Sequence, residues 1–138
     1  MKRTAILYCL LIVQLSSYAN ITLPRFFTDH MVLQRNQSIP LWGWAAPGEK
    51  ISITFVDQQK QVVADKSGKW TLRLDPETAG GPYELSIKGM NTIVLTDVMV
   101  GDVWICSGQS NMEWTVVQSL NAVEELAKAD NPYIRHIK

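Results

Sequence analysis

The chain has 138 residues, of which 46% are hydrophobic and 19% charged, with 13 basic and 13 acidic side chains. This is an ordinary globular composition, and the balanced charge argues against a nucleic-acid-binding protein, which would carry a basic excess. The apolar run near the N-terminus is far shorter than the roughly 20 residues needed to cross a bilayer.

The first 19 residues have the pattern of a secretory signal peptide. Lys2 and Arg3 precede the apolar run 5–13, and Ser17-Tyr18-Ala19 is a small-x-small cleavage site. An uncleaved N-terminal anchor is the alternative. Cleavage after Ala19 predicts a periplasmic or extracellular protein that makes no membrane contact once mature.

The pattern of residues 20–96 predicts an antiparallel β-sandwich in which one face of each strand is exposed to solvent. Short runs of alternating apolar and polar residues are separated by turn signals about every 8–12 residues. The alternation of Ile51, Ile53 and Phe55 with Ser52 and Thr54 is an example. The expected strands begin at Met31 and cover 39–44, 51–55, 62–64, 70–74, 83–87 and 93–95, with turns at 45–48, 58–60 and 66–68.

The pattern changes after position 96. An apolar run, 98–106, reads as a buried strand that ends in Ser-Gly-Gln-Ser-Asn. Apolar residues at helical spacing then predict a helix over 119–129 with Ser119 as its N-cap, and 133–137 reads as a further strand. Strand, helix and strand make a βαβ unit, which implies a parallel sheet that needs more strands. We therefore expect residues 97–138 to be the start of an incomplete second domain.

Ser110 is the candidate nucleophile. Gly108 lets the chain bend tightly, Ser110 follows in the turn, and Asn111 offers an amide beside it. A serine in a polar turn is more often only a turn residue or an N-cap. The α/β-hydrolase elbow Gly-x-Ser-x-Gly is not matched, because Met112 stands where its second glycine would be.

Several separated motifs resemble the sialate O-acetylesterase family of SGNH (GDSL-like) hydrolases. The resemblance implies that Ser110 attacks an acetyl carbonyl and that its backbone N–H helps to hold the oxyanion. It also implies a histidine base from a late Asp-x-x-His block, and a glycine and an asparagine from two middle blocks, none of which is found here. The motifs are 107–113 (Ser-Gly-Gln-Ser-Asn-Met-Glu), 97–104, 30–35, Trp42-Gly43-Trp44, 47–49, 68–70 and 80–83.

The chain has two histidines. Neither lies in an Asp-x-x-His block, so both are poor candidates for the base. His30 lies about eighty residues upstream in a turn of the expected sandwich, where the family carries it as a structural residue. His136 has Tyr133 where the aspartate of Asp-x-x-His would stand, and Asp130 is six residues away. Acid–base assistance is typically worth about 10²–10⁴-fold in rate, so we expect this chain alone to be inactive or nearly so.

Neighbours of Ser110 are the candidate substrate-binding residues. Gln109, Asn111 and Glu113 are expected to line the pocket, although a structural role in the turn is the alternative for each. Trp104 is expected in the core and Trp114 either in the core or at the site. Cys106 is the only cysteine left after signal cleavage, so no intramolecular disulfide is expected, and within its apolar run it reads as a small buried hydrophobe.

Three functions from different classes stay open. The first is a secreted esterase acting on O-acetylated sialic acid or another acetylated glycan. The second is a carbohydrate-binding sandwich without catalysis, in which Trp42 and Trp44 share one face of a strand and stack on sugar rings. The third is a non-functional fragment of the first. The sequence contains neither a metal-ligand cluster nor a phosphate-binding loop, so no cofactor is expected, and the oligomeric state is left open.

Overall fold

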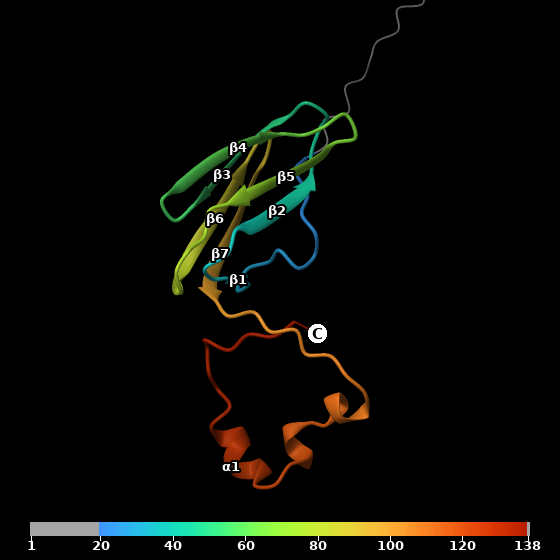
Figure 1. Ribbon diagram of the computed structural model, residues 1–138, viewed down its shortest axis with the longest axis vertical. Coiled ribbons are helices and arrows are strands. Elements are labelled where there is room, and N and C mark those ends of the chain that lie inside the picture. Colours follow the sequence, from blue (N-terminus) through green and yellow to red (C-terminus); the bar gives the residue numbers. More distant parts are fainter. Residues whose placement is uncertain (1–19, 138) are drawn as a thin grey trace, which may run out of the picture.

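The computed structural model describes residues 20–137 (Figure 1). The signal-peptide prediction over residues 1–19 lies outside this range. Seven strands precede three short helical turns. Among the described residues, no helix is both long and apolar enough to cross a membrane. The strands are β1 (Val32–Gln34), β2 (Ile39–Trp44), β3 (Lys50–Phe55), β4 (Gln58–Val63), β5 (Lys69–Leu74), β6 (Gly80–Lys88) and β7 (Thr92–Gly101).

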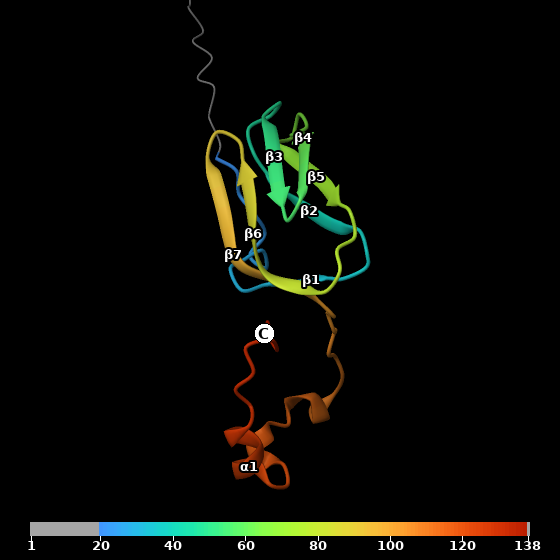
Figure 2. The ribbon, with the colours of Figure 1, turned by 90° about the vertical axis from the view of Figure 1, so that its left-hand side faces the viewer.

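The strands form two sheets that share one core. The larger sheet has the order β1-β7-β6-β3-β4, and β2 and β5 make a separate antiparallel pair (Figures 1 and 2). Leu41 and Leu74 of the small sheet belong to the same buried cluster as Ile53 and Phe55 of the large one. The expectation of a mainly β chain is confirmed.

Alternation along the strands produces this core. On β5, Trp70, Leu72 and Leu74 are buried while Lys69 and Arg73 are exposed. A strand with one apolar face can bury that face only against another layer, so the small sheet must pack on the large one.

The predicted turn at 58–60 is wrong. These residues begin β4, and the chain reverses at Val56 and Asp57, so that Phe55 pairs directly with Gln58. Val56 takes a positive φ of 51° there, a conformation that β-branched residues rarely adopt. The sequence pattern therefore placed this turn too late in the chain, because valine has a low propensity for turns.

The sheet continues past position 96, where the sequence suggested a domain boundary. β7 is a single strand from Thr92 to Gly101. Its final residues pair in parallel with β1, Val32 opposite Met99 and Gln34 opposite Gly101. The boundary between residues 96 and 97 stays a prediction, but regular pairing ends only at Gly101.

Residues 102–137 leave the sheet and return to it as one large loop (Figure 1). The loop holds the 3-10 turns η1 (Ser110–Glu113) and η2 (Val116–Gln118) and the short helix α1 (Ala122–Ala127). None of the residues 102–137 in the described structure is buried. The loop therefore has no core of its own.

Three local predictions for this loop are wrong. The apolar run 98–106 leaves the sheet after Gly101. The helix is confined to Ala122–Ala127 and its N-cap is Asn121, while Ser119 donates its hydroxyl proton to the Val116 carbonyl at 2.6 Å. No strand forms at 133–137 within the described chain.

The ends of the neighbouring strands, the occupied edges of β7 and the lack of packing explain these corrections. β1 ends at Gln34, opposite Gly101, and β6 begins at Gly80, opposite Val100, so β7 has no partner beyond Gly101. β7 already has β1 on one edge and β6 on the other. A strand returning at 133–137 therefore finds no free edge of β7 to pair with, and the expected βαβ unit does not form. Short helices with nothing to pack against are marginal, which limits α1 to fewer than two turns.

The contact between β2 and the N-terminal segment predicts a specific sensitivity at Gly43. A Cβ there would meet the Thr22 carbonyl oxygen and lie 2.9 Å from the Trp70 ring. Gly43→Ala is expected to lower the free energy of unfolding by about 1–3 kcal/mol, because the backbone and the indole must both shift. Urea unfolding of the purified chain measures this change.

Gly101→Ala is the matched control. Its Cβ would meet only Val32 Cγ1 at an ordinary 3.5 Å, so a change within about 0.5 kcal/mol is expected. Equal stability of the Gly43 and Gly101 variants would contradict the packing described for β2.

Candidate active site

Side chains at the end of β1 and directly after it hold the start of the loop that carries Ser110. Arg35 Nε donates to Asp102 Oδ1 at 2.8 Å, and the Val103 amide donates to Gln34 Oε1 at 2.9 Å. The Arg35 guanidinium is the main reason why the pKa of Asp102 lies below its ordinary value. These contacts fix where the chain leaves the sheet, and the segment that leads to Ser110 starts there.

A second cluster receives the returning end of the loop. Asp97 accepts hydrogen bonds from Arg135, with Nη2 at 2.9 Å from Oδ1, and its other oxygen lies 2.5 Å from His30 Nδ1. His30 and Asp97 both have positive φ, 64° and 53°. Asp97 is therefore the point where the N-terminal segment, β7 and the loop meet.

Ser110 begins η1 and is exposed. The turn is closed by backbone bonds from the Met112 amide to the Gln109 carbonyl (2.9 Å) and from the Trp114 amide to the Asn111 carbonyl (3.3 Å). Gln109 and Asn111 thus contribute their backbone carbonyls to the turn, while the roles predicted for their side chains stay predictions.

A shallow hollow of about 250 Å³, here called the serine hollow, is lined by Ser110, Glu113, Trp114 and Gln118. Ser110 and Glu113 stand at the two ends of η1, so one turn brings their side chains to the same depression. Gln109 and Asn111 do not line it. Of the four residues predicted for the site, the structure brings together Ser110 and Glu113.

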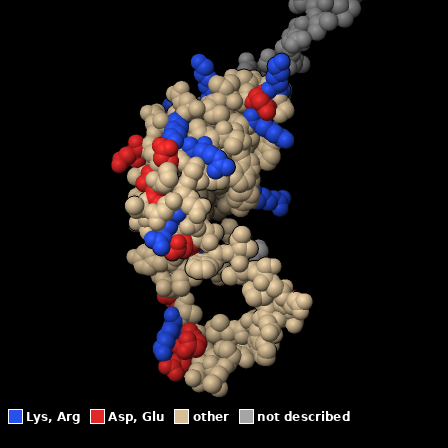
Figure 3. All heavy atoms as spheres, in the orientation of Figure 1, with Lys and Arg blue, Asp and Glu red and all other residues tan. Residues whose placement is uncertain are grey.

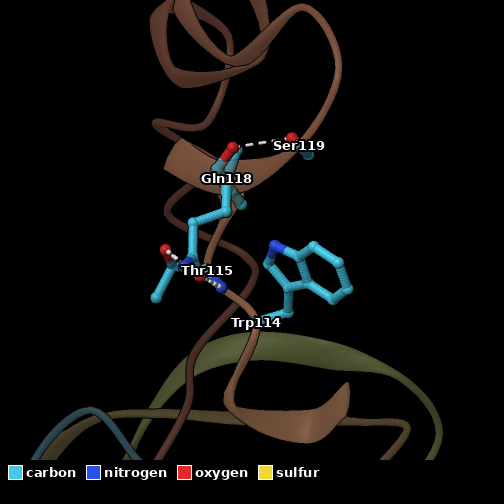
Figure 4. Close-up of a pocket in the computed structure, with 5 residues that line it drawn as sticks. Trp114, Thr115, Gln118 and Ser119 are labelled. Atoms are coloured by element: carbon cyan, nitrogen blue, oxygen red, sulfur yellow. Dashed lines mark hydrogen bonds between the residues drawn. The ribbon is translucent and has the colours of Figure 1, made fainter.

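Gln118 is the residue that the sequence reasoning missed. Its Oε1 accepts from the Thr115 amide at 3.1 Å and from the Thr115 hydroxyl at 3.2 Å. The signal was present as a Thr-x-x-Gln capping box over 115–118. Gln118 also lines an adjoining hollow of about 340 Å³. In Figure 4 the Trp114 ring lies apart from the Thr115 and Gln118 side chains that line the same hollow.

The described residues that line the serine hollow include one carboxylate, Glu113, and no histidine. His30 is engaged by Asp97 at the sheet, and His136 is exposed in the loop outside the hollow. A serine hydroxyl needs a base to take its proton before it attacks a carbonyl. Neither described histidine is therefore placed to take a proton from the Ser110 hydroxyl.

The tryptophans and the cysteine near Ser110 face solvent. Trp104, expected in the core, is 84% exposed, and Trp114 is 66% exposed. Cys106, expected to be buried, is an exposed free thiol. The reason is that pairing stops at Gly101, before any of them.

On the face shown in Figure 3, the loop surface is almost bare of charged side chains except for one cluster at its lower left.

Exposure of Cys106 predicts fast reaction with a thiol reagent. In a Cys9→Ser background, which leaves one thiol, the folded and the urea-unfolded chain should react with dithiobisnitrobenzoate at rates within about threefold of each other, because access does not limit the reaction. Protection of the folded chain by a hundredfold or more would contradict the placement of this segment.

The cluster at Asp97 predicts an acid-sensitive step in stability. The hydrogen bond with His30, and then the one from Arg135, hold the pKa of Asp97 below its usual 3.8. A depressed pKa contributes stability that is present above the unfolded value and lost as pH falls through the folded value. Denaturant unfolding between about pH 7 and about pH 3 should show the chain losing more stability than Asp97→Asn.

Asparagine suits this test because it tolerates a positive φ as aspartate does. Asp57→Asn is the matched control, since the Asp57 carboxylate makes no hydrogen bond or ion pair within residues 20–137. Identical pH profiles for the chain and for Asp97→Asn would rule out the proposed contribution.

Comparison with solved structures indicates the class of protein. A crystal structure of a carbohydrate acetylesterase from Xanthomonas citri matches with a TM-score of 0.78 and 41% identity, over 81% of this chain and 26% of that chain. No protein-family model matches.

Curated relatives narrow the class. The sialate O-acetylesterase of Mus musculus is 39% identical over 114 residues, and that of Homo sapiens is 37% identical over the same length. The alignments cover 74% of this chain but only 21% and 22% of those proteins. The chain is a homologue of the sialate O-acetylesterases and spans about a fifth of the length of the curated relatives it matches.

Proposed function

We propose that this chain is the nucleophile-bearing part of a carbohydrate O-acetylesterase of the SGNH type, with Ser110 as the nucleophile. The observation that carries the proposal is the exposed Ser110 beside Glu113 and Trp114 in the serine hollow, on a chain homologous to acetylesterases. The substrate class is an acetylated glycan, with O-acetylated sialic acid as the specific candidate.

The reaction proceeds in two halves. Ser110 Oγ attacks the acetyl carbonyl while its proton passes to a base, and the C–O bond of the ester breaks as the sugar hydroxyl leaves with a proton. Water then hydrolyses the acetyl-serine and releases acetate. The Ser110 backbone N–H supports the oxyanion in both halves.

Four neighbours have proposed roles in holding the substrate. Glu113 lines the hollow and accepts hydrogen bonds from sugar hydroxyls. Gln109 and Asn111, whose carbonyls close the turn, stand beside the hollow, and their amide side chains contact substrate that extends beyond it. Trp114, 66% exposed, supplies an apolar wall.

The base is proposed to come from polypeptide that the relatives possess outside the matched fifth. The serine hollow has no histidine among its described lining residues. The exposed apolar side chains of the loop, Ile105 and Leu120 among them at 93% and 89%, are the kind of surface that further polypeptide covers. In this proposal an Asp-x-x-His block docks against the loop and completes the site.

Secretion is part of the same proposal. The N-terminal pattern over 1–19 predicts export, and extracellular or periplasmic glycans are the acetyl esters available there. Homology to esterases favours catalysis over the sandwich acting only as a binding module.

A chimera tests the nucleophile. The matched fifth of the mouse sialate O-acetylesterase is replaced by this chain, and hydrolysis of an aryl acetate is measured. Ser110→Ala should lower kcat by about 10³-fold or more with little change in KM, because it removes the attacking atom and leaves the hollow. The chain alone should show almost no turnover, because it lacks the base.

Ser107→Ala is the matched control, since it removes a neighbouring hydroxyl of the same exposed segment that does not line the serine hollow. Its kcat in the chimera should stay within about threefold of the parent. Full activity of the Ser110→Ala chimera would overturn the assignment.

A further inference from the structure

The outer face of the small sheet carries an aromatic surface that the serine hollow does not use. On β2, Ile39, Leu41 and Gly43 point into the core, so Trp42 and Trp44 point outward on the same side. Phe26, from the segment that pairs with β2 through Thr22 and Trp44, lies against Trp42 with ring centroids 5.2 Å apart. We call Phe26, Trp42 and Trp44 the aromatic platform.

The platform is both rigid and open. Phe27, which is buried, packs edge-on against Trp42 at 5.1 Å and anchors the platform to the core. Phe26 and Trp44 nevertheless keep 44% and 43% of their surface exposed. Rings held by a sheet present flat apolar faces at low entropic cost.

Cationic side chains line the neighbouring strand on the same face. The register places Lys69 opposite Trp44 and Arg73 opposite Pro40, both exposed. Neither forms an ion pair with any residue in the range 20–137. The nearby Asp65 carboxylate accepts from Ser67 and from the Lys69 backbone amide, and Lys60 is paired with Asp75.

We propose that the aromatic platform with Lys69 and Arg73 is a second, non-catalytic binding site for a glycan that bears a carboxylate. The apolar face of a sugar ring stacks on the exposed rings, and the carboxylate pairs with one of the two cations. A protein partner fits less well, because a stable interface buries about 800 Å² on each side, far more than three side chains expose. The site lies on β2 and β5, so it does not depend on the role of Ser110.

The experiment titrates the full chain with 3′-sialyllactose and, separately, with lactose, its neutral counterpart. Tryptophan indole N–H resonances in proton–nitrogen NMR spectra report where each sugar binds. Sialyllactose should bind saturably and shift the Trp42 and Trp44 signals, leaving that of Trp104 in place. Lactose should bind at least about fivefold more weakly, because it lacks the charge.

Variants separate the two parts of the site. Trp44→Ala should weaken sialyllactose binding by about fivefold or more. Replacing both cations, in Lys69→Gln with Arg73→Gln, should bring its affinity close to that of lactose. Trp104→Ala is the matched control, an exposed tryptophan outside the platform, and it should leave binding unchanged. Native-like spectra of each variant verify that it is folded.

Three results would overturn the proposal. They are no saturable shift with sialyllactose, equal affinity for the acidic and the neutral sugar, and undiminished binding by a folded Trp44→Ala. Because no readout involves ester hydrolysis, failure here leaves the proposed esterase untouched, and failure of the esterase leaves this site untouched.

Discussion

The strand β1 pairs in parallel with the last residues of β7 through Val32, Leu33 and Gln34. Side chains on both flanks of this pairing hold together segments that are almost seventy residues apart in sequence. Arg35 and Gln34 bind Asp102 and Val103 at one end. His30 meets Asp97 at the other. Because β1 ends at Gln34, opposite Gly101, the chain leaves the sheet after Gly101, and the segment that leads to Ser110 starts from that exit.

The motifs around 30–35 and 97–104 have a joint physical meaning. They are the two sides of one contact. Backbone pairing aligns the two strands, and the ion pairs fix the path of the chain on either side of that pairing. Exposed ion pairs of this kind contribute little stability by themselves. Their effect here is positional, since each fixes where a loop begins or returns.

The loop from 102 to 137 is held at its ends and unsupported between them. Asp102 and Val103 tie its start, and Arg135 ties its return through Asp97. Its many apolar side chains gain nothing from burial in this arrangement, although covering them is worth about 25 cal/mol per Å². These uncovered apolar side chains agree with a loop that packs against further polypeptide, as proposed for the esterase site.

The sequence alone determined the local elements and the ancestry. Alternation predicted β2, β3 and β5, because burial on one face forces a period of two, and the motifs around Ser110 pointed to the acetylesterases that the comparisons then identified. Local chemistry also marked Ser110 and Glu113, which share the serine hollow.

Only the tertiary structure decided how far each pattern extends. The apolar run 98–106 reads as one strand, yet β1 and β6 occupy both edges of β7 and pairing ends at Gly101, which exposes Trp104 and Cys106. The meeting of His30, Asp97 and Arg135 likewise leaves no local signature. Periodicity records which face of a segment is apolar, whereas the presence of a partner for that face depends on contacts between residues distant in the chain.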